Sequence, residues 1–131
     1  MNTNIFQDEL KSLLADRFSV TEAIRANYAR GEDIFDPVLP LGIAFPETTE
    51  EVSKILSICN QASQPLVVHG GLTGLVYGTR SSSDQLVLSL ERMNEVEEID
   101  PVGRTITCQS GVTLQTIQEK AESENMIFVI S

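Results

Sequence analysis

The sequence has few basic residues, and this shortage argues against two classes of partner. Lysine and arginine together number 9 against 19 acidic residues, which gives a formal net charge of -10. A nucleic-acid interface needs a basic surface, and electrostatic binding to anionic lipid needs a basic patch. Neither partner is therefore expected, and the simplest interpretation of the acidic excess is that it maintains solubility.

Cysteine and histidine are also scarce. The chain has 2 cysteines, Cys59 and Cys108, and 1 histidine, with neither CxxC spacing nor a histidine cluster. A zinc site is not expected from this pattern. We expect Cys59 on a helix in the core and Cys108 in a strand, both as free thiols, which fits a reducing compartment.

Long apolar runs are missing as well. The opening segment MNTNIFQDELKSLL has early acids and no apolar core of signal-peptide length, and no run is long enough to span a membrane. We therefore predict a cytoplasmic location. A length of 131 residues suits one domain, and a hydrophobic content of 41% can form a core.

Helical patterns come first along the chain. Apolar spacing predicts a helix from about residue 4 to Phe18, and Ser19 followed by Glu22 predicts a capped second helix from Val20 to near Gly31. The prolines of GEDIFDPVLP indicate an irregular linker.

A mixed pattern of strands and helices follows the linker. Thr48 with Glu51 forms a capping-box pattern before a helical stretch, and another helix is expected in VTLQTIQEKAESEN. PVGR is a turn between two alternating runs and predicts a hairpin. The runs predicted as strands are LGIAF, LVVH, QLVLSL, NEVEEID, TITCQS and MIFVIS. The first strand, helix and strand of this series predict a parallel βαβ unit.

A glycine-rich segment, HGGLTGLVYGTRSSSD, follows LVVH. Glycine permits close approach of the backbone to a ligand, and successive N–H groups in such a loop can bind a pyrophosphate. The segment lacks the lysine of a P-loop, and it leads into a strand instead of the helix that a Rossmann GxGxxG needs. A glycine-rich connection without a ligand remains an alternative.

The order of these segments resembles a known family. PLGIAFPETTEEVSKIL, PLVVHGGLTGL and LVLSLERMNEVEEIDPVGRTITCQSGVTL are similar to the FAD-linked oxidases of the vanillyl-alcohol oxidase type, in the glycolate oxidase and D-lactate dehydrogenase branch. The resemblance runs from about Pro40 to Phe128. It implies an α+β (α/β) fold in which two helices precede the N-terminal βαβ subdomain of a PCMH-type FAD-binding domain. Residues 1–36 would be a helical extension, and residues 37–131 the N-terminal part of that domain.

The resemblance also implies a cofactor site. The segment would hold the FAD pyrophosphate through backbone amides, with Gly78 and Thr79 toward the isoalloxazine ring. Gly111 would lie close to the cofactor, although tight packing alone would explain this glycine. The implied cofactor-binding residues are His69, Gly70, Gly71, Leu72, Thr73, Gly74, Leu75, Gly78, Thr79 and Gly111.

The sequence departs from the family pattern at several positions. His69 replaces a usual arginine, Leu72 a usual glycine and Tyr77 a small residue, which raises the alternative of a degenerate site. Thr73 stands where related flavoproteins carry a histidine linked to the flavin, so FAD would be noncovalent. For His69 itself two interpretations remain: phosphate binding or proton transfer, and a structural role at a strand end.

The implied parent is an oxidoreductase that uses FAD to oxidise a 2-hydroxy acid such as glycolate or D-lactate. The apolar run at the chain end is either a true last strand or a sign that the chain is a piece of something longer. We expect the latter, with a second lobe and a substrate domain as missing partners, weak FAD binding, no activity of the chain alone and homo-oligomers formed through the exposed surface. The alternatives are a non-catalytic binding or assembly module and a generic α/β domain for another phosphorylated ligand.

Overall fold

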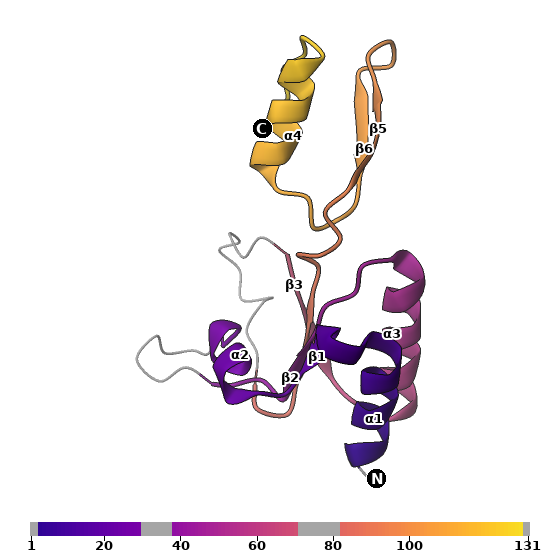
Figure 1. Cartoon of the computed structure of the whole chain (residues 1–131), viewed down its shortest axis with the longest axis vertical. Helices are drawn as coiled ribbons and strands as arrows, with labels where there is room; N and C mark the ends of the chain where they lie inside the picture. The colour runs from indigo at the N-terminus through magenta and orange to yellow at the C-terminus, as the bar shows by residue number, and fades with distance from the viewer. Residues whose placement is uncertain (1–2, 30–37, 71–81, 130–131) are drawn as a thin grey trace.

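The computed structural model of the chain describes residues 3–29, 38–70 and 82–129, and it contains two β-sheets (Figure 1). The helices are α1 (Thr3–Leu14), the 3-10 helix η1 (Ala15–Arg17), α2 (Glu22–Asn27), α3 (Thr49–Gln61) and α4 (Leu114–Ser123). The strands are β1 (Phe18–Ser19), β2 (Gly42–Ala44), β3 (Leu66–His69), β4 (Leu86–Ser89), β5 (Val96–Asp100) and β6 (Thr105–Cys108). This mixture of helices and strands confirms the predicted α+β (α/β) fold class.

The larger sheet has four strands in the order β1-β2-β4-β3. β4 runs parallel to both of its neighbours, β2 and β3, while β1 is an outer strand that pairs antiparallel with β2. The predicted parallel unit of β2, α3 and β3 is therefore present, but β4 lies between its two strands. Helix α3 begins as predicted, because the Thr48 hydroxyl accepts a hydrogen bond from the amide of Glu51 at 3.1 Å.

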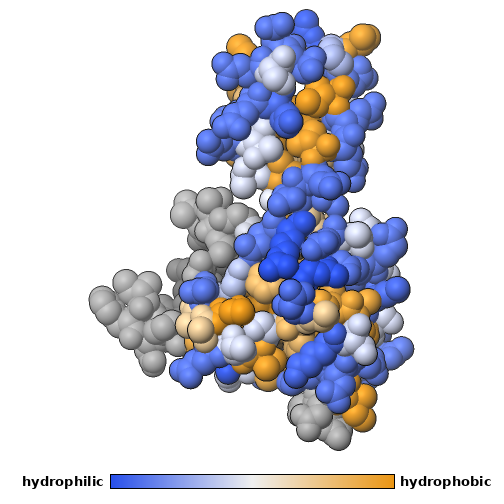
Figure 2. Space-filling view, in the orientation of Figure 1, coloured by the Kyte–Doolittle hydropathy of each residue, from blue (hydrophilic) through white to orange (hydrophobic). Residues whose placement is uncertain are grey.

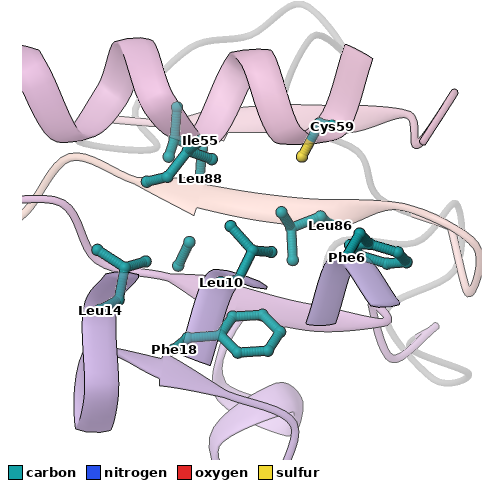
Figure 3. Packing of buried hydrophobic residues seen from close by; sticks show 9 residues of the cluster. Phe6, Leu10, Leu14, Phe18, Ile55, Cys59, Leu86 and Leu88 are labelled. Atoms are coloured by element: carbon teal, nitrogen blue, oxygen red, sulfur yellow. The ribbon is translucent and has the colours of Figure 1, made fainter. Parts of the chain in front are cut away.

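Helices cover both faces of this sheet. On one face, α1 and α3 pack against β1, β2 and β4, and the side chains of this layer form the main core (Figure 3). Its buried members are Phe6, Leu10, Leu14, Phe18, Ala44, Ile55, Cys59, Leu86 and Leu88. The opposite face carries Ile43, Val67 and Val87, against which Ile24 and Tyr28 from the α2 region pack. Alternate residues of the short central strands thus point to opposite hydrophobic layers, so both faces must be apolar.

The hairpin of β5 and β6 and helix α4 stand beyond the carboxyl ends of the parallel strands (Figure 1). The hairpin turn falls at the predicted PVGR. Cys108 lies in β6 and Cys59 in α3, both as free thiols, as predicted. Burial of Cys59 raises the pKa of its thiol to about 11, so the group stays protonated.

The predicted boundaries were wrong at both ends of the described chain. The first helix stops at Leu14 because Ala15 adopts a left-handed φ of 54°, and Phe18 then joins the sheet. The second helix begins at Glu22 after Thr21, without a side-chain cap. At the other end, residues 126–129 form no strand, and a left-handed Asn125 with a φ of 57° follows α4.

Candidate functional site

The three parallel strands end at one edge of the sheet, and the glycine-rich segment leaves from that edge. β2 leads into Phe45, β3 ends at His69 before Gly70, and β4 ends at Ser89 before Glu91. Ligands of parallel sheets bind outside the carboxyl ends of the strands. This edge is therefore the candidate functional site.

His69 is buried at this edge, with 1% of its surface exposed. It pairs with Ser89 in the parallel ladder, and its carbonyl oxygen accepts a hydrogen bond from the amide of Leu90 at 3.0 Å. Its ring stacks on that of Tyr28, with centroids 6.3 Å apart and planes inclined by 27°. These surroundings are those of a strand-end structural residue, while a role in phosphate binding or proton transfer stays a prediction.

Gly70 and Gly111 have opposite surroundings. A Cβ at Gly70 would meet no atom of the described residues within 4 Å, so these residues leave its backbone open to a ligand. A Cβ at Gly111 would lie 1.7 Å from the carbonyl oxygen of Leu90 and 2.8 Å from that of Met93. The structure thus brings Gly111 to the same edge as His69, since both contact the backbone of Leu90, and packing alone requires the glycine at position 111.

The remaining predicted cofactor residues lie outside the described part of the chain. They are Gly71, Leu72, Thr73, Gly74, Leu75, Gly78 and Thr79. What the structure fixes is the point from which their segment departs. The open backbone of Gly70 at a carboxyl strand end fits the approach of a phosphate group.

The sequence did not single out a cluster of side chains at the same edge. The Tyr28 hydroxyl donates a hydrogen bond to the carboxylate of Glu91, and the Ser89 hydroxyl donates to the same Oε1 atom at 2.9 Å. The Arg92 guanidinium lies over the ring of Phe45, 5.0 Å from its centroid. Charged residues directly after a buried strand were a usable signal for Glu91 and Arg92, whereas no local pattern marks Tyr28.

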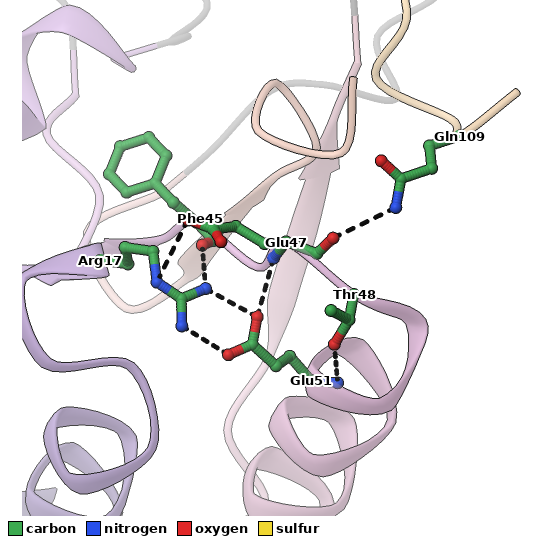
Figure 4. Close-up of polar contacts among 6 residues, drawn as sticks. All are labelled: Arg17, Phe45, Glu47, Thr48, Glu51 and Gln109. Carbon is green, nitrogen blue, oxygen red and sulfur yellow. Dashed lines mark hydrogen bonds and ion pairs between the residues drawn. The ribbon is translucent and has the colours of Figure 1, made fainter. Parts of the chain in front are cut away.

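A second polar network joins η1, the residues directly after β2 and the start of α3 (Figure 4). Arg17 donates to both carboxylate oxygens of Glu51, at 2.6 and 2.5 Å, and to the carbonyl oxygen of Phe45 at 3.2 Å. Glu51 also accepts from the amide of Glu47 at 2.9 Å. The hydrogen bond from Arg17 holds the pKa of Glu51 down at about 2. The network ties η1 to the first turn of α3 and fixes the backbone where β2 ends.

The described residues carry neither a metal cluster nor a membrane-spanning helix. Within residues 3–29, 38–70 and 82–129, no group of three or more histidine, cysteine or acidic side chains could hold a metal ion. No helix in those ranges combines the length and apolar character needed to cross a membrane.

Comparison with known proteins gives a family match over most of the chain. The model of a family described as "FAD binding domain" matches residues 40–131. D-2-hydroxyglutarate dehydrogenase of Stutzerimonas stutzeri is 33% identical over 126 residues, which is 94% of this chain and 27% of that protein. Glycolate oxidase subunit GlcD of Bacillus subtilis is 34% identical over 90 residues, 69% of this chain and 19% of that protein. A mitochondrial D-2-hydroxyglutarate dehydrogenase of Danio rerio is 38% identical over 82 residues, 63% of this chain and 15% of that protein.

Solved structures show the same fold. The structure of p-cresol methylhydroxylase matches with a TM-score of 0.82 and 21% identity, over 94% of this chain and 25% of that one. The chain spans between 15% and 27% of the length of these curated relatives.

Proposed function

Since the chain belongs to the FAD binding domain family, we propose that it is the FAD-binding part of a flavin-dependent oxidoreductase that oxidises a 2-hydroxy acid. The observation that carries the proposal is the family match over residues 40–131. Within this region, β3 ends at His69, directly before the glycine-rich segment. The substrate class is supported by the printed names of the relatives, because 2-hydroxyglutarate and glycolate are both 2-hydroxy acids.

In this proposal the chain binds and orients the cofactor. The backbone amides from Gly70 onward would hold the pyrophosphate, and the edge residues would fix the start of that segment. FAD, when bound, supplies the group that accepts hydride. Binding is noncovalent and weak in this chain, which spans less than a third of its relatives, and substrate oxidation belongs to a longer protein with a second lobe and a substrate domain.

Self-association is a further part of the proposal. Several large apolar side chains of the hairpin turn and the chain after α4 are exposed, among them Val102 (95%), Ile127 (90%) and Val129 (76%). Figure 2 shows hydrophobic residues gathered over this part of the molecule, within a largely hydrophilic face. Exposed apolar surface of this kind favours association between chains. The cytoplasmic location stays a prediction, and the Danio rerio relative is named as mitochondrial.

Titration calorimetry with FAD tests the proposal. The wild-type chain is expected to bind FAD, and Gly70→Ala and Gly74→Val are expected to weaken binding by about tenfold or more, because a Cβ blocks close backbone approach. Gly70→Ala is informative because no atom of the described residues lies within 4 Å of the added methyl, so its thermal unfolding should match that of the wild type.

Val102→Ser is the matched control, since it removes an exposed side chain at the hairpin turn. It should leave FAD binding unchanged. A folded wild-type chain that does not bind FAD would contradict the proposal and support the non-catalytic module.

A further inference from the structure

A groove lies between the β5–β6 hairpin and the carboxyl end of α4. Its volume is about 720 Å³, and its apolar lining includes Ile106 of β6, Ala121 of α4, and Met126, Ile127 and Phe128 after α4. Ile127 is almost fully exposed and Phe128 is partly exposed. The groove therefore presents apolar surface that the described residues leave largely uncovered.

The two sides of the groove carry opposite charges. Arg104 lines it from the hairpin turn, and Glu124 lines it from the carboxyl cap of α4. Both residues are exposed, and neither side chain forms a hydrogen bond or an ion pair with another described residue. Within the described chain, the lining thus offers one unpaired cation and one unpaired anion.

Each side also carries an exposed aliphatic side chain. Val102 in the hairpin turn is almost fully exposed, and it lies between Pro101 and Arg104, which both line the groove. Ile127 is its counterpart on the other side, close in sequence to Glu124. The two halves of this surface are therefore alike in apolar character and opposite in charge. A surface whose halves complement each other fits a second copy of itself across a two-fold axis.

We propose that this surface is the interface of a symmetric dimer, in which the hairpin turn of one copy packs against the residues after α4 of a second copy. Arg104 then lies opposite Glu124 of the second copy, and the two-fold axis repeats this ion pair. The inference rests on the self-association in the proposed function, and it adds the surface, the partner and the symmetry. It does not depend on FAD, because its residues lie in the hairpin, in α4 and in the chain that follows α4.

The test is the dimer Kd, measured by sedimentation velocity, for the wild type and for charge-reversal variants. Arg104→Glu and Glu124→Arg each place like charges opposite one another at both contacts, so each should raise the Kd roughly tenfold or more. An equimolar mixture of the two variants should recover the wild-type Kd, because both contacts of a mixed dimer join opposite charges. The double variant Arg104→Glu/Glu124→Arg should recover it too. The deficit of each single variant should shrink in 1 M NaCl, because salt screens the repulsion.

Lys120→Glu is the matched control. It changes the net charge by the same amount as Arg104→Glu and lies exposed on α4, but Lys120 does not line the groove. Its Kd should stay within about twofold of the wild-type value, since an exposed charge outside the interface contributes little.

The outcomes separate this inference from the rest of the proposed function. A monomeric wild-type chain overturns the dimer together with the proposed self-association, while FAD binding is decided by its own titration. A wild-type dimer that both reversals leave unchanged, or single variants that the mixture does not rescue, overturns this arrangement alone. An equal loss of dimer in Lys120→Glu would also overturn it, because net charge would then explain the effect.

Discussion

At the scale of the residue, Gly111 has no space for a side chain. An added Cβ would approach two backbone carbonyl oxygens, one of them to 1.7 Å. Gly111→Ala must shift backbone, and we expect the free energy of unfolding to fall by about 1–3 kcal/mol in urea denaturation. Gly70→Ala is the control, because its methyl meets no atom of the described part of the chain within 4 Å, and it should change the free energy of unfolding by a few tenths of the loss in Gly111→Ala. Equal losses of stability in the two variants would contradict the tight packing around Gly111.

This contrast also bears on function. A loss of FAD binding in Gly111→Ala would not place the cofactor at Gly111, because the substitution disturbs the fold. The same loss in Gly70→Ala would place the cofactor near Gly70, because that position tolerates a methyl group.

The ion pair of Arg17 and Glu51 predicts a dependence of stability on pH. Since the hydrogen bond from Arg17 lowers the pKa of Glu51 from 4.5 to about 2, the pair stabilises the fold fully above pH 4.5 and loses its contribution as the pH falls to about 2. At pH 7, Glu51→Gln should lower the free energy of unfolding by about 1.5–3 kcal/mol. The difference between wild type and variant, measured by urea denaturation from pH 7 to pH 2, should close within that acidic window. A difference that is constant with pH would count against the pair.

At the scale of the element, helix α3 depends on its cap. The Thr48 hydroxyl accepts from the Glu51 amide at 3.1 Å, so Thr48→Ala should destabilise the chain by about 1 kcal/mol. Thr21 occupies the same N-cap position of α2 without a side-chain cap hydrogen bond, so Thr21→Ala is the matched control with a smaller expected loss. Thermal unfolding compares the two, and a larger loss at Thr21 would refute the prediction.

How far the elements could be predicted depends on where their interactions lie. Helix α3 carries its own signals, a cap at Thr48 and apolar residues at helical spacing, and the hairpin carries its turn in PVGR. The short strand β1 carries no such signal, because Phe18 becomes a strand residue only through pairing with Ala44. Local periodicity therefore predicted a helix there, and tertiary pairing decided otherwise.

The candidate site divides in the same way. The glycine-rich segment and His69 were visible in the sequence, because glycine content and an apolar run are local properties. The bond between Tyr28 and Glu91 joins residues 63 positions apart, and nothing near either residue indicates it. Contacts of this kind depend on the order of the strands, which the pattern of apolar runs does not determine.

At the scale of the whole molecule, the four-stranded sheet is more deeply buried than the hairpin and α4. The four-stranded sheet has helices on both faces and a buried core, whereas the strands of the hairpin are half-buried or exposed and α4 buries only Ala121 among its residues. Amides of β2 and β4 should therefore exchange with deuterium roughly tenfold or more slowly than those of β5 and β6. Hydrogen-exchange mass spectrometry measures this ratio, and uniform protection across both sheets would show a single cooperative unit instead.

The place of β4 between β2 and β3 governs how the chain can fold during synthesis. The ribosome delivers β2, then α3, then β3, and the strand that pairs with both parallel strands emerges only with residues 86–89. Until then β3 lacks the strand with which its backbone groups form hydrogen bonds. The side chain of Val67 also lacks Val87 of β4, with which it shares a hydrophobic cluster. The parallel sheet consequently closes in one late step, when β4 enters between two strands that have already left the ribosome.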